Sequence, residues 1–125
     1  MIPQYTKNKN KGYIVESGSN NNGSYTKFSD GTMICFNEVV REINFHQNGS
    51  VYTGETNVKV SYPYEFIAPP KVIINTESVN DYYYCCIYAI IRDQKSINGM
   101  SFLRATLDNN LVNIPFVYTA IGKWK

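Results

Sequence analysis

The sequence predicts an all-β protein, an antiparallel β-sandwich of about seven or eight short strands. Short runs rich in tyrosine and β-branched residues recur along the chain, and 11 of its 125 residues are tyrosines. Clusters of glycine, asparagine, serine and proline separate these runs at short spacing. No helical period of apolar residues persists for ten residues. Together these patterns are typical of a sandwich.

One domain is expected, spanning residues 12–125, because a chain of this length can bury a core without disulfides or metals. Residues 1–11 are polar and unpatterned, which indicates a flexible leader or the end of a linker to an upstream segment.

The most patterned stretch flanks Asp30-Gly31, a strong hairpin signal. A two-residue type I′ turn there would place Phe28 opposite Met33, both facing the core. Lys27 would then lie on the opposite face. We therefore expect a hairpin in this register.

Apolar and polar residues alternate clearly in residues 58–62, whereas the pattern of residues 39–44 is mixed and weakens the boundary of the strand 32–45. Turn-forming residues bound the predicted strands, for example residues 17–23, which we expect to be a loop. In chain order, with the first strand of the hairpin included, the predicted strands cover residues 12–16, 24–28, 32–45, 58–62, 71–76, 82–92, 101–107 and 114–124.

The strand 82–92 is apolar on both faces. Such a strand is either central in a sandwich or buried by a neighbouring subunit. It motivates the expectation of an oligomer.

Three cysteines argue against a disulfide framework, because Cys85 and Cys86 are adjacent and point to opposite faces of a strand. We expect buried, reduced thiols, as in a protein made in a reducing cytosol. A net charge of +2 does not indicate nucleic acid or an anionic membrane as a partner. No signal peptide or membrane helix is visible in the sequence.

Three motifs occur in order along residues 12–125. They are Asn22-Gly-Ser-Tyr-Thr-Lys-Phe-Ser-Asp-Gly-Thr-Met-Ile-Cys35, Tyr62-Pro-Tyr-Glu-Phe66 with Ala68-Pro-Pro-Lys-Val72, and Ala120-Ile-Gly-Lys-Trp-Lys125. Together they resemble the C-terminal domains of phage tail fibres. The chain departs from that pattern at Phe36-Asn37, where the family usually has Trp-Gly, and Tyr118 stands where an aromatic residue, often Trp, is expected.

The resemblance implies a β-sandwich similar in layout to H-type lectins, which assembles as a homotrimer at a fibre tip. Related domains occur on phage-tail-like bacteriocins and in prophages. The implied function is receptor binding, with a bacterial surface saccharide or protein as partner. The implied location is a virion tail fibre, or a phage-tail-like particle, assembled in the bacterial cytoplasm. Residues 1–11 would connect the domain to upstream fibre segments. The alternative is a structural fibre or baseplate module that caps or trimerises a shaft without binding a receptor.

Candidate ligand-binding residues are Asp81, Tyr82, Tyr84, Arg92 and Arg104. Tyrosine rings could stack on sugar C–H faces, while Asp81 and the tyrosine hydroxyls hydrogen-bond to sugar hydroxyls. The arginines could line a pocket or pair with buried carboxylates. The competing interpretation of the tyrosines is ordinary core or subunit packing.

The sequence gives no catalytic motif. His46 is the single histidine and we expect it in an exposed loop. No motif pairs two carboxylates as a glycosidase requires. We therefore expect a protein that is not an enzyme and that carries neither a metal ion nor a cofactor.

Overall fold

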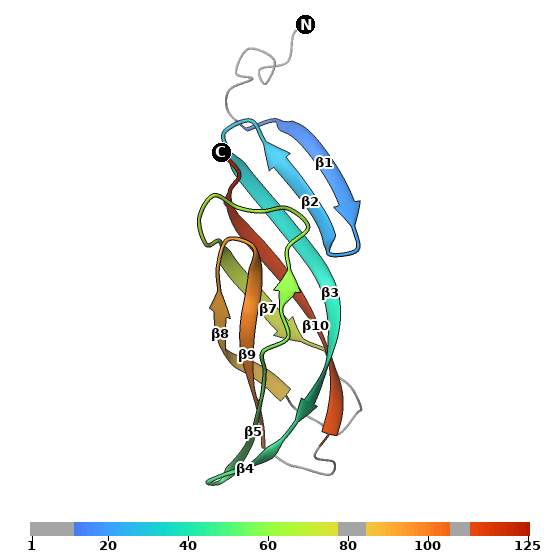
Figure 1. The fold of residues 1–125 in the computed structure, drawn as a ribbon, viewed down its shortest axis with the longest axis vertical. Coiled ribbons are helices and arrows are strands. Elements are labelled where there is room, and N and C mark those ends of the chain that lie inside the picture. The colour runs from blue at the N-terminus through green and yellow to red at the C-terminus, as the bar shows by residue number, and fades with distance from the viewer. Residues whose placement is uncertain (1–11, 78–84, 106–110) are drawn as a thin grey trace, which may run out of the picture.

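Two antiparallel sheets form the fold of this chain (Figure 1), which is known here from a computed structural model that describes residues 12–77, 85–105 and 111–125. The strands are β1 (Ile14–Asn20), β2 (Gly23–Phe28), β3 (Thr32–Asn44), β4 (His46–Asn48), β5 (Val51–Thr56), β6 (Val60–Ser61), β7 (Lys71–Thr76), β8 (Cys85–Arg92), β9 (Ser96–Arg104) and β10 (Leu111–Lys123). The all-β, antiparallel prediction is confirmed, with ten strands among the described residues in place of the seven or eight expected.

The first sheet has the strand order β1-β2-β3-β10-β7. Its centre is the pair β3 and β10, two strands of 13 residues each, which pair from Thr32–Lys123 to Asn44–Leu111. They run side by side along much of the molecule (Figure 1), with the β1–β2 hairpin at one end and the β4–β5 hairpin at the other.

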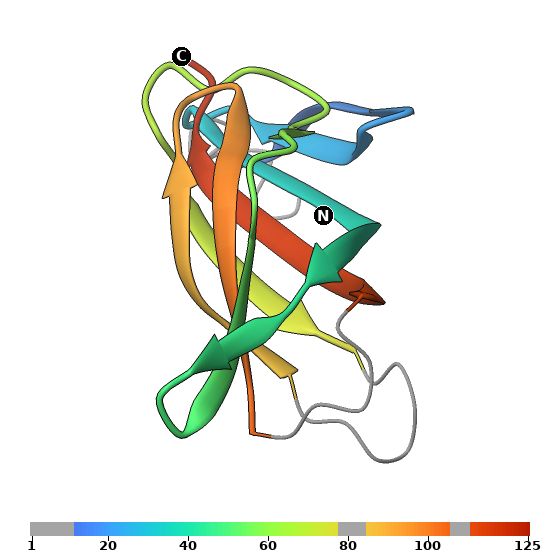
Figure 2. The same ribbon diagram turned by 60° about the horizontal axis from the view of Figure 1, so that its bottom comes forward.

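The second sheet is built around β9. Strand β8 pairs along one side of β9, while β5 and the short β6 pair with successive parts of its other side. Strand β4 continues the sheet beyond β5. Figure 2 shows this layer lying over the layer of β3, β7 and β10.

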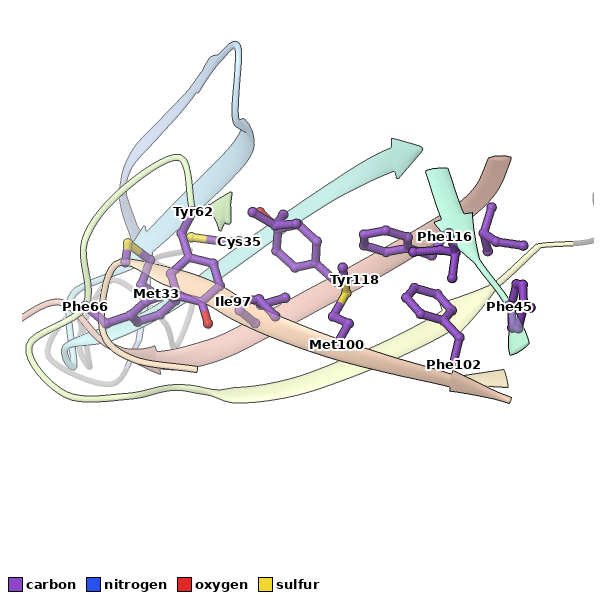
Figure 3. Packing of buried hydrophobic residues seen from close by; sticks show 14 residues of the cluster. Met33, Cys35, Phe45, Tyr62, Phe66, Ile97, Met100, Phe102, Phe116 and Tyr118 are labelled. Atoms are coloured by element: carbon purple, nitrogen blue, oxygen red, sulfur yellow. The ribbon is translucent and has the colours of Figure 1, made fainter. Parts of the chain in front are cut away.

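The core lies between the layers and follows from strict alternation in β10, where every second residue from Ile114 to Ala120 is buried. Side chains of β9 meet them from the second sheet (Figure 3), for example Phe102 against Phe116. The buried apolar cluster comprises Met33, Cys35, Ile43, Phe45, Val60, Tyr62, Phe66, Ile97, Met100, Phe102, Ile114, Phe116, Tyr118 and Ala120.

The hairpin exists, but its predicted register is wrong by one residue. Lys27, not Phe28, lies opposite Met33. The Gly31 amide donates to the Phe28 carbonyl, and Gly31 has a φ of 95°, whereas Asp30 has a negative φ. This longer turn replaces the type I′ turn, and a one-residue slip moves every side chain of the first strand to the other face. Lys27 is consequently turned inward.

Strand β8 is not central in the sandwich. In the described part of the chain it pairs with β9 alone, so it is an edge strand of the second sheet. Ile87 and Ile90 are half-buried, but Cys86, Tyr88 and Ile91 are exposed. The expectation that all three thiols are buried is therefore wrong for Cys86.

The remaining differences concern boundaries. The β4–β5 hairpin was not predicted as strands, and β9 begins at Ser96 inside a segment expected to be a loop. His46 is exposed as expected, although it lies in β4 and not in a loop.

Candidate binding site

The predicted site residues do not form one described cluster. Asp81, Tyr82 and Tyr84 lie outside the described residues, so their role stays a prediction. Arg92 ends β8, whereas Arg104 lies opposite Cys85 at the other end of the strand pair. At about 3.3 Å per residue, roughly 20 Å separates the two arginines. They cannot contact the same small ligand.

Arg92 and Arg104 are both engaged inside the protein. The Arg92 Nε donates a hydrogen bond of 2.5 Å to the carbonyl of Pro70, which ties the end of β8 to the segment before β7. Arg104 is 1% exposed, and its guanidinium carbon lies 5.1 Å from the centre of the Phe45 ring.

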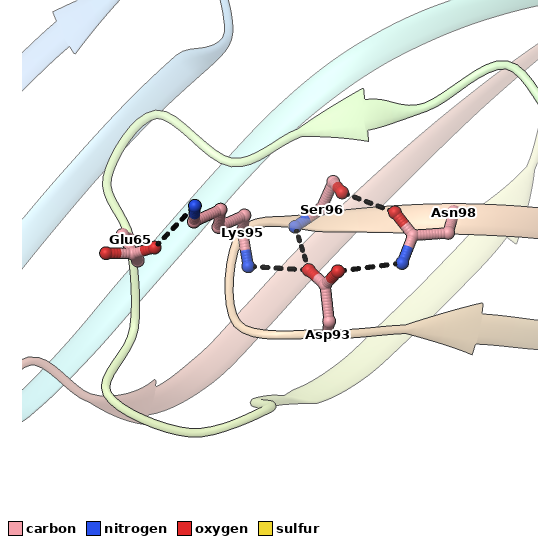
Figure 4. Close-up of polar contacts among 5 residues, drawn as sticks. All are labelled: Glu65, Asp93, Lys95, Ser96 and Asn98. Carbon is pink, nitrogen blue, oxygen red and sulfur yellow. Dashed lines mark hydrogen bonds and ion pairs between the residues drawn. The ribbon is translucent and has the colours of Figure 1, made fainter.

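The turn between β8 and β9 is built on Asp93 (Figure 4). One carboxylate oxygen accepts from the amides of Lys95 (2.7 Å) and Ser96 (2.9 Å), and the other accepts from Asn98 Nδ2 (2.9 Å). The bond from Asn98, followed by those from the two amides, lowers the pKa of Asp93. Lys95 also pairs with Glu65 at 3.6 Å. The hydrogen bonds of this cluster hold the turn between β8 and β9.

A cage of aromatic rings surrounds Lys27, which is 4% exposed. Its ammonium lies 3.4 Å from the centre of the Tyr64 ring and 5.0 Å from that of Trp124. Glu16 adds an ion pair of 3.3 Å. Desolvation alone would lower the pKa of Lys27, but the contacts with Tyr64 and Glu16 outweigh it, so the pKa is raised. The cage joins the hairpin of β2 and β3 to the loop after β6 and to the end of the chain. Lys27 itself occupies the space between the rings.

A polar groove of about 320 Å³ opens where β2 leaves β3. In the described chain, the pairing of β2 with β3 ends at Ser24–Phe36, although β3 runs on to Asn44. One side of β3 is therefore uncovered from Asn37 onward. The groove is lined by the turn between β1 and β2, by the middle of β3 and by β6 with the residue before it; its polar side chains are Asn21, Asn22, Asn37, Glu38, Arg41, Lys59 and Ser61.

Hydrogen bonds hold the walls of this groove in place. The Asn20 side chain donates to the Pro63 carbonyl at 2.8 Å, and the Tyr118 hydroxyl reaches the Asn22 carbonyl at 3.4 Å. The Arg41 guanidinium donates to the carbonyls of Val40 (3.0 Å) and Lys59 (3.1 Å), which links β3 to the segment before β6. The groove is thus a feature of the folded backbone.

Glycine is required at position 23, beside the groove. Gly23 has a φ of 122°, and a Cβ there would lie 2.8 Å from Asn37 Cβ. The close approach of this turn to β3 sets the width of the groove.

Sequence reasoning missed this groove, although two signals were present. The asparagines at positions 20–22 were interpreted as turn formers only. The mixed pattern of β3 after Phe36 weakened its boundary, and that is where the strand loses its neighbour.

An apolar patch lies on the outer face of the first sheet. Thr119 of β10 lies between Phe36 of β3 and Ile73 of β7, which are 51% and 60% exposed. Two residue pairs along, on the same face, Ile121 lies beside Ile34. We call these residues, Ile34, Phe36, Ile73 and Ile121, the outer patch.

Within the described ranges, no group of three histidine, cysteine, aspartate or glutamate side chains could hold a metal ion. Likewise, no helix in that part of the chain is long and apolar enough to cross a membrane.

Comparison with solved structures places the fold beside those of pyocin fibres. An N-truncated R1-type pyocin tail fibre matches with a TM-score of 0.53 and 14% identity, over 98% of this chain and 98% of that one. A C-terminal fragment of the P. aeruginosa R1 pyocin fibre matches with a TM-score of 0.49 and 16% identity, over 86% of this chain and 28% of that one. No protein-family model matches the sequence, and neither does any curated protein sequence. The first likeness shows a shared fold.

Proposed function

We propose that this chain is the receptor-binding tip domain of a phage or phage-tail-like fibre. The observation that carries the proposal is the fold match over nearly the whole of both chains to a pyocin tail fibre. The three sequence motifs support it independently, since they resemble the C-terminal domains of tail fibres.

The structure gives these motifs physical roles. Lys27 of the first motif, Tyr64 of the second and Trp124 of the third meet in one cage. The Trp124 ring nitrogen also donates to the Phe28 carbonyl at 2.9 Å. The cage residues of the three motifs therefore close one end of the sandwich, and in this proposal recognition belongs to surfaces outside the cage.

In this proposal the domain binds a bacterial surface saccharide or protein, without catalysis, as a homotrimer attached to upstream fibre segments. The fibre belongs to a virion or phage-tail-like particle assembled in the bacterial cytoplasm. Several weak sites on one particle multiply the affinity for a cell surface. The outer patch supports self-association, because contiguous exposed apolar side chains mark protein interfaces.

A pull-down on a panel of bacterial strains tests the function. The labelled intact domain should bind the cells of some strains, and an excess of unlabelled domain should compete. The paired variants Tyr82→Ala and Tyr84→Ala should bind less if the predicted tyrosine site is correct. Equal binding by these variants would overturn that site alone. Binding by no form to any strain would overturn receptor recognition and favour a structural module. Shortening of host polysaccharide during incubation would contradict the non-enzymatic assignment.

A further inference from the structure

We propose that the polar groove between the β1–β2 turn, β3 and β6 binds one sugar unit of a bacterial surface polysaccharide. This inference rests on the proposed receptor-binding function and assigns it a place.

The lining of the groove matches the chemistry of a sugar. A sugar hydroxyl both donates and accepts, so a sugar site needs donors and acceptors close together. The residues that line the groove, of about 320 Å³, include Asn21, Asn22, Asn37, Glu38 and Lys59, whose side chains carry amide, carboxylate and ammonium groups. Such a volume lies in the range of small-molecule pockets.

These polar groups are available to a ligand. Among the described residues, the side chains of Asn21, Asn22, Glu38, Lys59 and Ser61 make no hydrogen bond or ion pair with protein, and all five residues are exposed. Asn37 accepts from the Glu38 amide at 2.8 Å through its oxygen, which leaves its NH₂ group unengaged by described protein atoms. In contrast, the polar groups of the Asp93 turn and of the Lys27 cage are used internally.

The charge of the lining favours a sugar over a simple anion. Arg41 and Lys59 are cationic, but Glu38 lies in the same groove and would repel a phosphate or sulfate. Two N–H groups of the Arg41 guanidinium already donate hydrogen bonds to backbone carbonyls. A neutral ring with several hydroxyls uses the carboxylate and the ammonium together.

A second hollow adjoins the groove. It has a volume of about 380 Å³ and shares Asn37 and Glu38 with the first. It offers space beside the groove for the next sugar of a polysaccharide. Two adjoining hollows suit a polysaccharide better than they suit a single free sugar.

The test compares two charge-balanced double variants of the full chain on an array of purified bacterial capsular and O-antigen polysaccharides. The first is Glu38→Ala with Lys59→Ala, which removes one acid and one base from the groove. The control is Glu42→Ala with Lys71→Ala, which removes an exposed acid from β3 and an exposed base from β7, both outside the groove. All four positions are exposed, so both variants should unfold at the wild-type temperature.

We expect the groove variant to bind the recognised polysaccharide at least about tenfold more weakly, because two charged hydrogen-bond partners are lost. The control variant should bind like the wild type. Equal binding by both variants and the wild type would overturn the groove and leave the proposed function standing. Binding by no form to any polysaccharide would overturn both the groove and a saccharide receptor. Complete competition by millimolar inorganic phosphate would identify an anion site and overturn the sugar assignment.

Discussion

At the scale of single residues, Lys27 is a buried lysine whose charge is compensated by its neighbours. A buried ammonium is unfavourable unless it is paired. Here the Tyr64 and Trp124 rings and the Glu16 carboxylate provide the pairing. The lysine therefore acts as a connector between three segments that are distant in sequence.

Replacement of Lys27 measures that connection. Lys27→Ala should lower the free energy of unfolding by about 2 kcal/mol, the size of a desolvated cation–π contact. Urea unfolding at pH 7 provides the measurement. Lys71→Ala, which removes an exposed lysine of β7, should change the free energy by less than about 0.5 kcal/mol. Equal stability of the two variants would show that the rings contribute nothing through Lys27.

At the scale of elements, the β8–β9 turn depends on one ionised carboxylate. The pKa of Asp93 is lowered, so its contribution to stability is present above the ordinary pKa and is lost as the pH falls through the lowered value. We expect the free energy of unfolding to fall below about pH 4. In Asp93→Asn this part of the acid dependence should be absent. The free energy of unfolding should then fall less steeply as the pH is lowered.

A carbon-detected NMR titration of the Asp93 carboxyl checks the cause. Its pKa should lie below that of an unperturbed aspartate, about 3.9. Wild type and Asp93→Asn are then unfolded in urea at pH values between about 2 and 7. A carboxyl that titrates at or above the ordinary value would contradict the hydrogen-bonded geometry of the turn.

Strand content was predictable from the sequence because alternation and turn residues are local signals. Register was not, because it depends on turn geometry. At Asp30-Gly31 a two-residue turn and a longer turn both fit the sequence, and they place Lys27 on opposite faces. A buried lysine becomes acceptable only once Tyr64 and Trp124 are known to meet it.

The position of β8 in its sheet could not be predicted from the sequence either. The strand is apolar on both faces, which indicates either a central strand or one buried by a neighbouring subunit, and β8 is an edge strand with Tyr88 and Ile91 exposed. The groove could not be predicted for the same reason. The local sequence around Glu38 and Lys59 does not show that the pairing of β2 with β3 stops at Ser24–Phe36. Such features arise from contacts between segments that are far apart along the chain.

At the scale of the whole molecule, the outer patch predicts self-association. Light scattering at micromolar concentration should give the mass of a trimer. Ile73→Glu places a charge in the patch and should shift the population to monomers, because burying an unpaired charge is unfavourable. The measurement requires no ligand.

Ile67→Glu is the matched control. Ile67 is 61% exposed, nearly the same fraction as Ile73 at 60%, but it lies outside the outer patch. It should leave the trimer intact. A wild-type domain that scatters as a stable monomer would contradict the trimer. Trimers in both variants would show that the interface lies elsewhere.

The long pairing of β3 with β10 also constrains the order in which the protein can fold during synthesis. Strand β3 is made early, but its partner along all 13 residues follows only after β4 to β9. Until β10 has left the ribosome, β3 can pair with β2 through Phe36 alone and exposes a long unpaired edge. Pairing between such distant segments slows folding and favours contacts between neighbouring nascent chains. Each chain must therefore complete its sandwich before its unpaired edges meet those of another nascent chain.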